Sequence, residues 1–194
     1  MNKYVPGILI GIGVAVASAI LLRMFVWTEG GPQPLIYPMF FGAFVAYILS
    51  NLAGNKKLTI VDGTAKQAAL QLKPPPGKAL LVVFREGFVA KLAGLNIAVD
   101  GAEFAQLTAP KFTVLTLSPG AHTLTCGFGG LAGPQSKKGT YDFSVAADAV
   151  HTVGIGVSMG LIQGNMTFTS IADLNAARAK VTNMPMVQAA PAEI

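Results

Sequence analysis

VPGILIGIGVAVASAILL, residues 5–22, and LIYPMFFGAFVAYILSNLA, residues 35–53, contain no formally charged side chain. The first stretch stays largely apolar as far as Trp27, and helix-breaking Gly and Pro residues separate it from the second. A helix rises about 1.5 Å per residue and the hydrocarbon core of a bilayer is about 30 Å thick, so about 20 residues are needed to cross it. The sequence therefore predicts a transmembrane helical hairpin over residues 1–54, with helices at 5–27 and 35–53.

A cleaved signal peptide is the alternative interpretation of the first apolar stretch. Lys3 supplies a weakly positive start, and the small residues around Ala17 resemble a cleavage site. The apolar region of a signal peptide, however, is typically only about 7 to 15 residues long. The greater length of residues 5–22 favours a helix that stays in the membrane.

Composition supports a membrane protein and restricts its chemistry. Charged residues make up 12% of the 194 residues, against roughly 25% in an ordinary soluble domain. The single cysteine excludes an intramolecular disulfide framework, and two histidines make a histidine-rich metal site or a conventional catalytic triad difficult to assemble. Composition therefore disfavours disulfide-rich domains, histidine-rich metal proteins and triad hydrolases.

Small residues recur at every fourth position of both apolar stretches. Such rows let two helix backbones approach closely, and close van der Waals packing is one of the few forces that bring helices together in lipid. The alternative is that Gly and Ala are simply common in membrane helices. Because the rows continue along both stretches, we expect them to be packing surfaces, facing either each other or a partner protein. The packing residues are Gly7, Gly11, Ala15, Ala19, Gly42, Ala46 and Ser50, and Gly54 continues the second row.

Aromatic and basic residues near the ends of the apolar stretches are expected at the membrane interface, where their polar tips reach the headgroups. Orientation depends on Lys and Arg, and those near the amino terminus and after the hairpin outnumber Arg23 on the turn side. We therefore expect a bacterial inner-membrane protein with both termini and the domain after the hairpin in the cytoplasm; a periplasmic domain is the alternative. The interface residues are Arg23, Trp27, Tyr37, Lys56 and Lys57.

Residues 55–181 change to short runs rich in Val, Leu, Phe and Thr, separated by turn residues, which is typical of an all-β domain. The expected form is an antiparallel β-sandwich, with a hairpin turn at Asp100-Gly101. One short helix over 170–181, capped by Ser170, and a tail over 182–194 follow. The expected strands are 57–62, 68–73, 79–85, 96–100, 103–107, 111–117, 122–128, 140–145, 150–157 and 164–169.

Three segments carry a family resemblance: GKALLVVFR (77–85), NIAVDG (96–101) and VLTLSPGAHTL (114–124). A strand ending in Arg, a strand ending in Asp-Gly and a strand leading through Pro-Gly-x-His into the next resemble the DUF2846 and PEGA-like β-sandwich domains. The resemblance covers residues 77–175 and implies a sandwich, whereas its motifs are turn chemistry and imply no activity. Many such domains follow a lipoprotein signal outside the inner membrane, but this chain has an apolar hairpin and no lipobox Cys near its start.

The residues suited to chemistry favour structural roles. His122 follows a Pro-Gly turn and is expected to stabilise it, while His151 begins a strand. Cys126 alternates with apolar neighbours and is expected in the core. Ser118, His122 and Asp100 lack the strained turn and the spacing of a catalytic triad. We therefore expect no catalytic, cofactor-binding or metal-binding residue, and no enzyme.

Positive charge is concentrated in residues 55–91, which hold seven basic and two acidic residues. Each lysine near an anionic leaflet gains about 1 kcal/mol, so we expect anionic lipid headgroups or an acidic partner to contact this segment. A solvated basic face is the alternative. Nucleic acid is disfavoured because aromatic residues are not interleaved with the basic ones. The glycine-rich segment 127–133 lacks the following helix that a dinucleotide-binding loop requires.

These features together favour a non-catalytic accessory subunit of a larger inner-membrane complex, for which a respiratory or photosynthetic assembly is a natural host. Its partners are then other integral membrane subunits. The few charges in residues 79–135, three basic and three acidic, support this interpretation because a surface covered by partners is poor in charge. A stand-alone, membrane-anchored module that binds a peptide or a ligand is the alternative.

Overall fold

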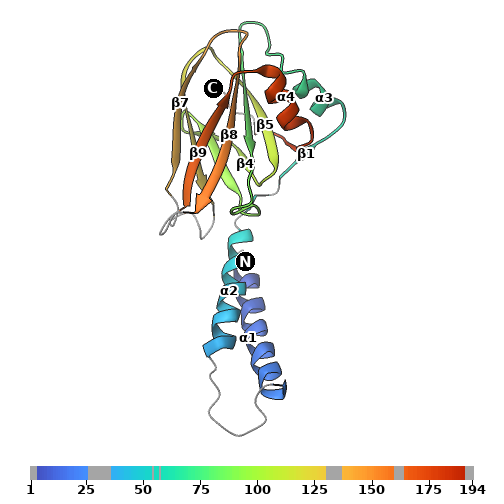
Figure 1. Cartoon of the computed structure of the whole chain (residues 1–194), viewed down its shortest axis with the longest axis vertical. Helices are drawn as coiled ribbons and strands as arrows, with labels where there is room; N and C mark the ends of the chain where they lie inside the picture. Colours follow the sequence, from blue (N-terminus) through green and yellow to red (C-terminus); the bar gives the residue numbers. More distant parts are fainter. Residues whose placement is uncertain are drawn as a thin grey trace. The chain divides into compact units, whose positions relative to one another are not determined.

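The computed structural model describes residues 4–25, 36–53, 55–56, 58–129, 137–159 and 164–190. The chain divides into two compact units, Met1–Asn55 and Lys56–Ile194. Figure 1 shows that the first unit is helical and that the second is built mainly of strands.

The helical unit consists of α1 (Val5–Phe25) and α2 (Ile36–Leu52), which pack against each other in antiparallel directions. Among the described residues, one helix, over Val5–Met24, is long and apolar enough to cross a membrane, and the apolar part of α2, Ile36–Ser50, is shorter. Both helices lie within the expected ranges. The turn between them, with Trp27, lies outside the described residues.

The β unit contains two sheets. The larger has the strand order β1-β10-β5-β2-β8-β9 and the smaller has the order β4-β3-β6-β7. The expected all-antiparallel pairing is wrong at two places, because β8 runs parallel to β2 and β10 runs parallel to β5. Long connections through the other sheet permit such parallel neighbours. The bounds are β1 Ile60–Val61, β2 Ala79–Arg85, β3 Leu95–Val99, β4 Ala102–Leu107, β5 Lys111–Leu117, β6 Gly120–Phe128, β7 Gly139–Val145, β8 Val150–Met159, β9 Gly164–Ile171 and β10 Met186–Val187.

Strand β2 is buried on both of its faces. Leu81 and Val83 pack between the two sheets, in the main core. Leu80 and Val82 point to the other side, where helices α3 (Thr64–Leu70) and α4 (Leu174–Thr182) cover the larger sheet. A strand buried on both faces is an almost continuous apolar run, and ALLVVFR fits that pattern. The β unit is therefore a sandwich with an additional helical layer on one side (Figure 1).

The strands of both sheets run between two ends of this sandwich (Figure 1). At one end, β2 terminates at Arg85 opposite the start of β5 at Lys111. The backbone N–H of Lys56 donates to Oε1 of Gln106, 2.7 Å away, where β4 terminates at the same end. We name it the Lys56 end. The connection 86–94 between β2 and β3 also lies there.

The strand expected at 68–73 is wrong, because this part of the chain begins in helix α3. The last five residues of this helix are good helix formers and lack the β-branched side chains that favour strands: Lys66, Gln67, Ala68, Ala69 and Leu70. The strand expected at 57–62 is reduced to β1, with Lys57 outside the described residues.

The helix expected at 170–181 begins later, at Leu174, because Ser170 and Ile171 extend β9 beside β8. Its cap is Asp173 and not Ser170, since the Asp173 carboxylate accepts from the N–H of Asn175 at 2.9 Å.

The tail expected over 182–194 is held by strand pairing in the part that the structure describes, residues 182–190. Strand β10 inserts between β1 and β5, and Val187 is only 2% exposed in the main core. Further along, the N–H of Ala190 donates to the carbonyl oxygen of Phe104 at 2.7 Å. The segment is ordered by backbone pairing that its own sequence, with two prolines and little charge, does not reveal.

Candidate functional site

The two rows of small residues meet in the helical unit. A Cβ atom added to Gly11 would lie 2.4 Å from Cβ of Ala46, and one added to Gly42 would lie 2.5 Å from Cβ of Ala15. Each would also lie 2.6 Å from a carbonyl oxygen of the facing helix. These separations are far below van der Waals contact, so only glycine permits this approach at positions 11 and 42.

Burial follows the same seam. Gly7, Gly11, Gly42 and Ser50 are buried, whereas Ala15, Ala19 and Ala46 are half-buried. A Cβ atom on Gly7 would lie 3.0 Å from both the backbone nitrogen and Oγ of Ser50. The structure therefore brings the two rows into contact along a seam that extends from Gly7 and Ser50 to Ala15 and Gly42. Gly54 lies outside the described residues.

The surface of the hairpin away from this seam is apolar. Its large exposed side chains include Leu9 at 62%, Met24 at 65% and Phe40 at 70% exposure. In water such a surface would be strongly unfavourable, because burial of apolar area gains about 25 cal/mol per Å². The helices therefore need a further apolar environment, either lipid or protein.

The expected interface residues lie as follows. Arg23 is exposed in the last turn of α1, and Tyr37 is 65% exposed in the first turn of α2. Lys56 belongs to the β unit, where its ammonium group forms an ion pair with Glu103. Trp27 and Lys57 lie outside the described residues.

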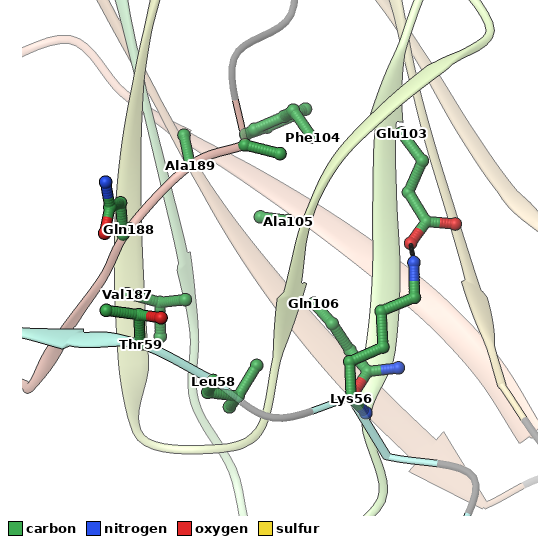
Figure 2. A pocket seen from close by; sticks show the side chains of 11 residues that line it. Lys56, Leu58, Thr59, Glu103, Phe104, Ala105, Gln106, Val187, Gln188 and Ala189 are labelled. Atoms are coloured by element: carbon green, nitrogen blue, oxygen red, sulfur yellow. Dashed lines mark hydrogen bonds and ion pairs between the residues drawn. The ribbon is translucent and has the colours of Figure 1, made fainter.

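A cavity of about 290 Å³ lies at the edge of the sandwich, beside β4 and β10 (Figure 2). Leu58 and Val187 supply apolar walls, and the Lys56–Glu103 ion pair crosses one side. Gln106 accepts from Lys56 and donates to Oδ1 of Asn96, so its amide is satisfied by the protein.

This edge cavity serves more readily as a join between three segments than as a catalytic pocket. Its volume is at the lower limit of roughly 300 Å³ for small-molecule sites. The charged groups in its wall neutralise each other, and the exposed edge of β4 is covered at Phe104 by the pairing with Ala190. Covering an edge strand in this way prevents pairing with another chain.

The turn histidine is held by two acceptors. Nδ1 of His122 lies 2.6 Å from Oδ2 of Asp100, and Nε2 lies 2.8 Å from the carbonyl oxygen of Ser118. A carbonyl oxygen can only accept, so Nε2 carries a proton. Burial opposes a positive charge here, but both hydrogen bonds and the charge of Asp100 outweigh it and raise the pKa of His122.

This geometry differs from a catalytic triad although it brings Asp100, His122 and Ser118 together. In a triad the ring nitrogen remote from the carboxylate accepts a proton from the nucleophile. Here that nitrogen donates to the backbone of Ser118, and Oγ of Ser118 accepts from Nζ of Lys78 at 3.2 Å. The arrangement joins the Asp100 turn to the turn that precedes β6.

The second histidine belongs to an aromatic cluster between the sheets. The ring of His151 stacks on Phe143 with centroids 4.7 Å apart, and the centroid of the Phe143 ring also lies 5.6 Å from that of His122. Burial lowers the pKa of His151. The two histidines thus respond to their surroundings in opposite directions.

The thiol of Cys126 is a core group. The residue is 2% exposed, and its Sγ lies 3.1 Å from the sulfur of Met166. Burial, only partly opposed by a backbone hydrogen bond from Gly139, raises the pKa of Cys126 to about 12. Because the thiolate is the reactive form, this thiol is inert at neutral pH.

Arg85 is a buried cation that the sequence analysis treated only as the last residue of a strand. The residue is 0% exposed, and its guanidinium donates to the carbonyl oxygens of Ala90, Ala93 and Leu107. The ring of Phe128 lies 5.4 Å from its central carbon. Desolvation lowers its pKa to about 10, so the group stays charged at neutral pH.

A signal for this role was present in the sequence. Arg85 follows Ala79, Leu81 and Val83 at strand spacing, and residues two apart on a strand share a face. That register predicts an inward-facing guanidinium. The carbonyl groups that receive it come from an irregular loop, which no periodic pattern reveals.

Groups of three or more His, Cys, Asp or Glu side chains that could hold a metal ion do not occur among the described residues. No protein-family model matches the chain, and no curated protein matches it either. The resemblance to DUF2846 and PEGA-like domains therefore stays a prediction from the sequence.

Replacing Gly11 with Leu should destabilise the hairpin. The new side chain would overlap Ala46 and a backbone carbonyl, and overpacking costs about 1–3 kcal/mol. Gly13→Leu is the matched control, because a Cβ there meets no described atom within 4 Å. Trp27 is the only tryptophan, so its fluorescence during thermal unfolding in mild detergent reports on the hairpin. Equal melting temperatures for the two variants would contradict the seam.

The two histidines should give opposite pH dependences. A raised pKa means that His122 stabilises the fold below its ordinary value of about 6.5, and that this stability is lost as pH rises through the folded value. A lowered pKa means that His151 removes stability as pH falls below about 6.5. Denaturation of His122→Gln and His151→Gln, followed by β-sheet circular dichroism between pH 5 and pH 8, measures both.

Relative to the wild type, the deficit of His122→Gln should be largest at the acidic limit of that range. The corresponding difference for His151→Gln should shift in favour of the variant as pH falls. The same pH slope in both variants would contradict the assignments.

Proposed function

We propose that this protein is a non-catalytic accessory subunit of an inner-membrane complex, anchored by the helical hairpin. The apolar outer surface of α1 and α2 carries the proposal. The seam through Gly11 and Gly42 satisfies only the inner surfaces of the two helices, whereas Leu9, Met24 and Phe40 stay exposed. Lipid together with other membrane subunits supplies the cover that this surface needs.

The β unit supports a structural role for the same protein. The polar groups in its edge cavity bond one another, His122 joins two turns, and the guanidinium of Arg85 holds a loop. These contacts join turns and loops to the strands of the sandwich. A β unit built in this way suits permanent packing against partner subunits more than a cycle of substrate binding and release.

The orientation we propose puts both termini and the β unit on the cytoplasmic side. The positive-inside rule counts Lys and Arg near the ends of a span. Arg23 opposes several lysines that follow the hairpin, among them Lys56 and Lys66. Anionic headgroups of the inner leaflet are then within reach of these lysines.

Extraction from native membranes in mild detergent should recover the protein in a complex of constant stoichiometry. The Gly11→Leu variant should be depleted from the complex because its hairpin seam is disturbed, and Gly13→Leu is the matched control. Native electrophoresis followed by mass spectrometry identifies the accompanying subunits. A monomer that carries no other protein, at every mild condition, contradicts the proposal and favours the stand-alone binding module.

Labelling of introduced cysteines should reveal the orientation. A membrane-impermeant maleimide added from outside should react with Gly31→Cys in the turn and not with Lys137→Cys in the β unit. The native Cys126 does not interfere, because it is 2% exposed and its pKa is raised to about 12. Both sites should react after the membrane is opened. Reaction of Lys137→Cys in intact cells would move the β unit to the periplasm.

A further inference from the structure

The loop 86–94 between β2 and β3 presents large apolar side chains to the solvent. Phe88 is 88% exposed, more than any other large apolar side chain among the described residues, and Leu92 is 65% exposed. Two tight turns shape the loop, through the hydrogen bonds from Lys91 N–H to the Phe88 carbonyl and from Ala93 N–H to the Ala90 carbonyl. Both apolar side chains therefore project from one compact loop.

Arg85 anchors this loop to the sandwich. Its guanidinium donates to the carbonyl oxygens of Ala90 and Ala93 inside the loop and to that of Leu107 on β4, the last at 2.9 Å. Hydrogen bonds from a charged donor are stronger than neutral ones, and breaking these would strand a buried cation. The loop is thus held against the sandwich with Phe88 exposed to the solvent.

Three exposed lysines lie at the same end of the sandwich as this loop. Lys91 lies within it, and Lys137 and Lys138 lead into β7 at the same end of the sandwich; all three are exposed. Among the described residues, none of the three has a carboxylate within ion-pair distance. The acidic residue of the loop, Glu86, is already paired with Lys180 of α4 at 2.7 Å.

This end of the sandwich is the one closest along the chain to the apolar helices. Lys56 is the first residue of the β unit, and its backbone bonds Gln106 at the Lys56 end. Helix α2 terminates at Leu52, four residues earlier. Four residues span at most about 14 Å, so a membrane-embedded α2 would keep the Lys56 end close to the bilayer surface.

We propose that loop 86–94 is a second membrane contact, with Phe88 and Leu92 inserted at the boundary between headgroups and acyl chains and with the exposed lysines on anionic headgroups. The inference rests on the proposed membrane anchoring and adds a specific lipid-binding element to it. Apolar side chains flanked by lysines are the chemistry that binds an anionic membrane surface. The second contact fixes the orientation of the β unit on the bilayer.

Spin labels on the full chain, reconstituted in vesicles of phosphatidylcholine and phosphatidylglycerol, test the inference. The test label is carried by Ala90→Cys, which leaves Phe88 and Leu92 intact in the loop. Ala147→Cys, exposed in the turn between β7 and β8 at the opposite end, is the aqueous control, and Val16→Cys on the outer surface of α1 is the membrane control. The enhancement of spin-label relaxation by oxygen and by a water-soluble nickel complex reports the depth of each label in the membrane.

The label at position 90 should be shielded from nickel and accessible to oxygen, whereas the label at 147 should remain accessible to nickel. Adding Phe88→Ser and Leu92→Ser should restore nickel access at position 90. Replacing Lys91, Lys137 and Lys138 with Gln should also restore it, in part, by removing the attraction to phosphatidylglycerol.

Nickel access at position 90 equal to that at 147, with the label at 16 shielded, overturns the loop contact and leaves the membrane anchor intact. Nickel access at position 16 overturns the anchor, and the loop contact with it. Shielding at position 90 that survives the serine substitutions also overturns the inference, because insertion of Phe88 and Leu92 would then not be its cause.

Discussion

Burial of β2 on both of its faces is the constraint on which the β unit depends. Leu81 and Val83 on one face close the core between the sheets, and Leu80 and Val82 on the other attach the helical layer. The same strand pairs with β5 on one side and with β8 on the other. A polar residue in its interior would therefore weaken whichever core its side chain faces. The single charge of the strand, Arg85, lies at its end, where carbonyl oxygens of the loop accept hydrogen bonds from it.

Short runs rich in Val, Leu, Phe and Thr between turn residues predicted most strands, because the strands of both sheets bury apolar side chains on one face or on both. The strands at 79–85 and 111–117 have the expected bounds. The expected elements differ from the structure where the helix propensity of a segment, or its pairing with distant strands, outweighs the local apolar pattern. Helix α3 follows its helix-forming residues, and β10 is a strand only because β1 and β5 supply hydrogen-bonding partners on either side.

The candidate sites also divide into those that sequence spacing predicts and those that only the fold creates. Spacing alone placed the small residues of the helices in rows, and the structure then brings Gly11 to Ala46 and Gly42 to Ala15. Contacts that depend on how separate strands and loops pack together were not available to such reasoning. The Lys56–Glu103 ion pair, the stack of His151 on Phe143 and the guanidinium bonds to loop 86–94 each join segments whose proximity only the completed fold creates.

The position of β10 has a consequence for synthesis. Ribosomes release the amino-terminal part first, so α1 and α2 are complete long before residues 186–187 exist. Until then β1 has no partner in the larger sheet, and one side of β5 stays open, because β10 separates these two strands. Pairing of residues so distant in the chain is slow, and open strand edges invite association. The β unit must therefore complete its larger sheet late, after the hairpin that precedes it has had time to find its own surroundings.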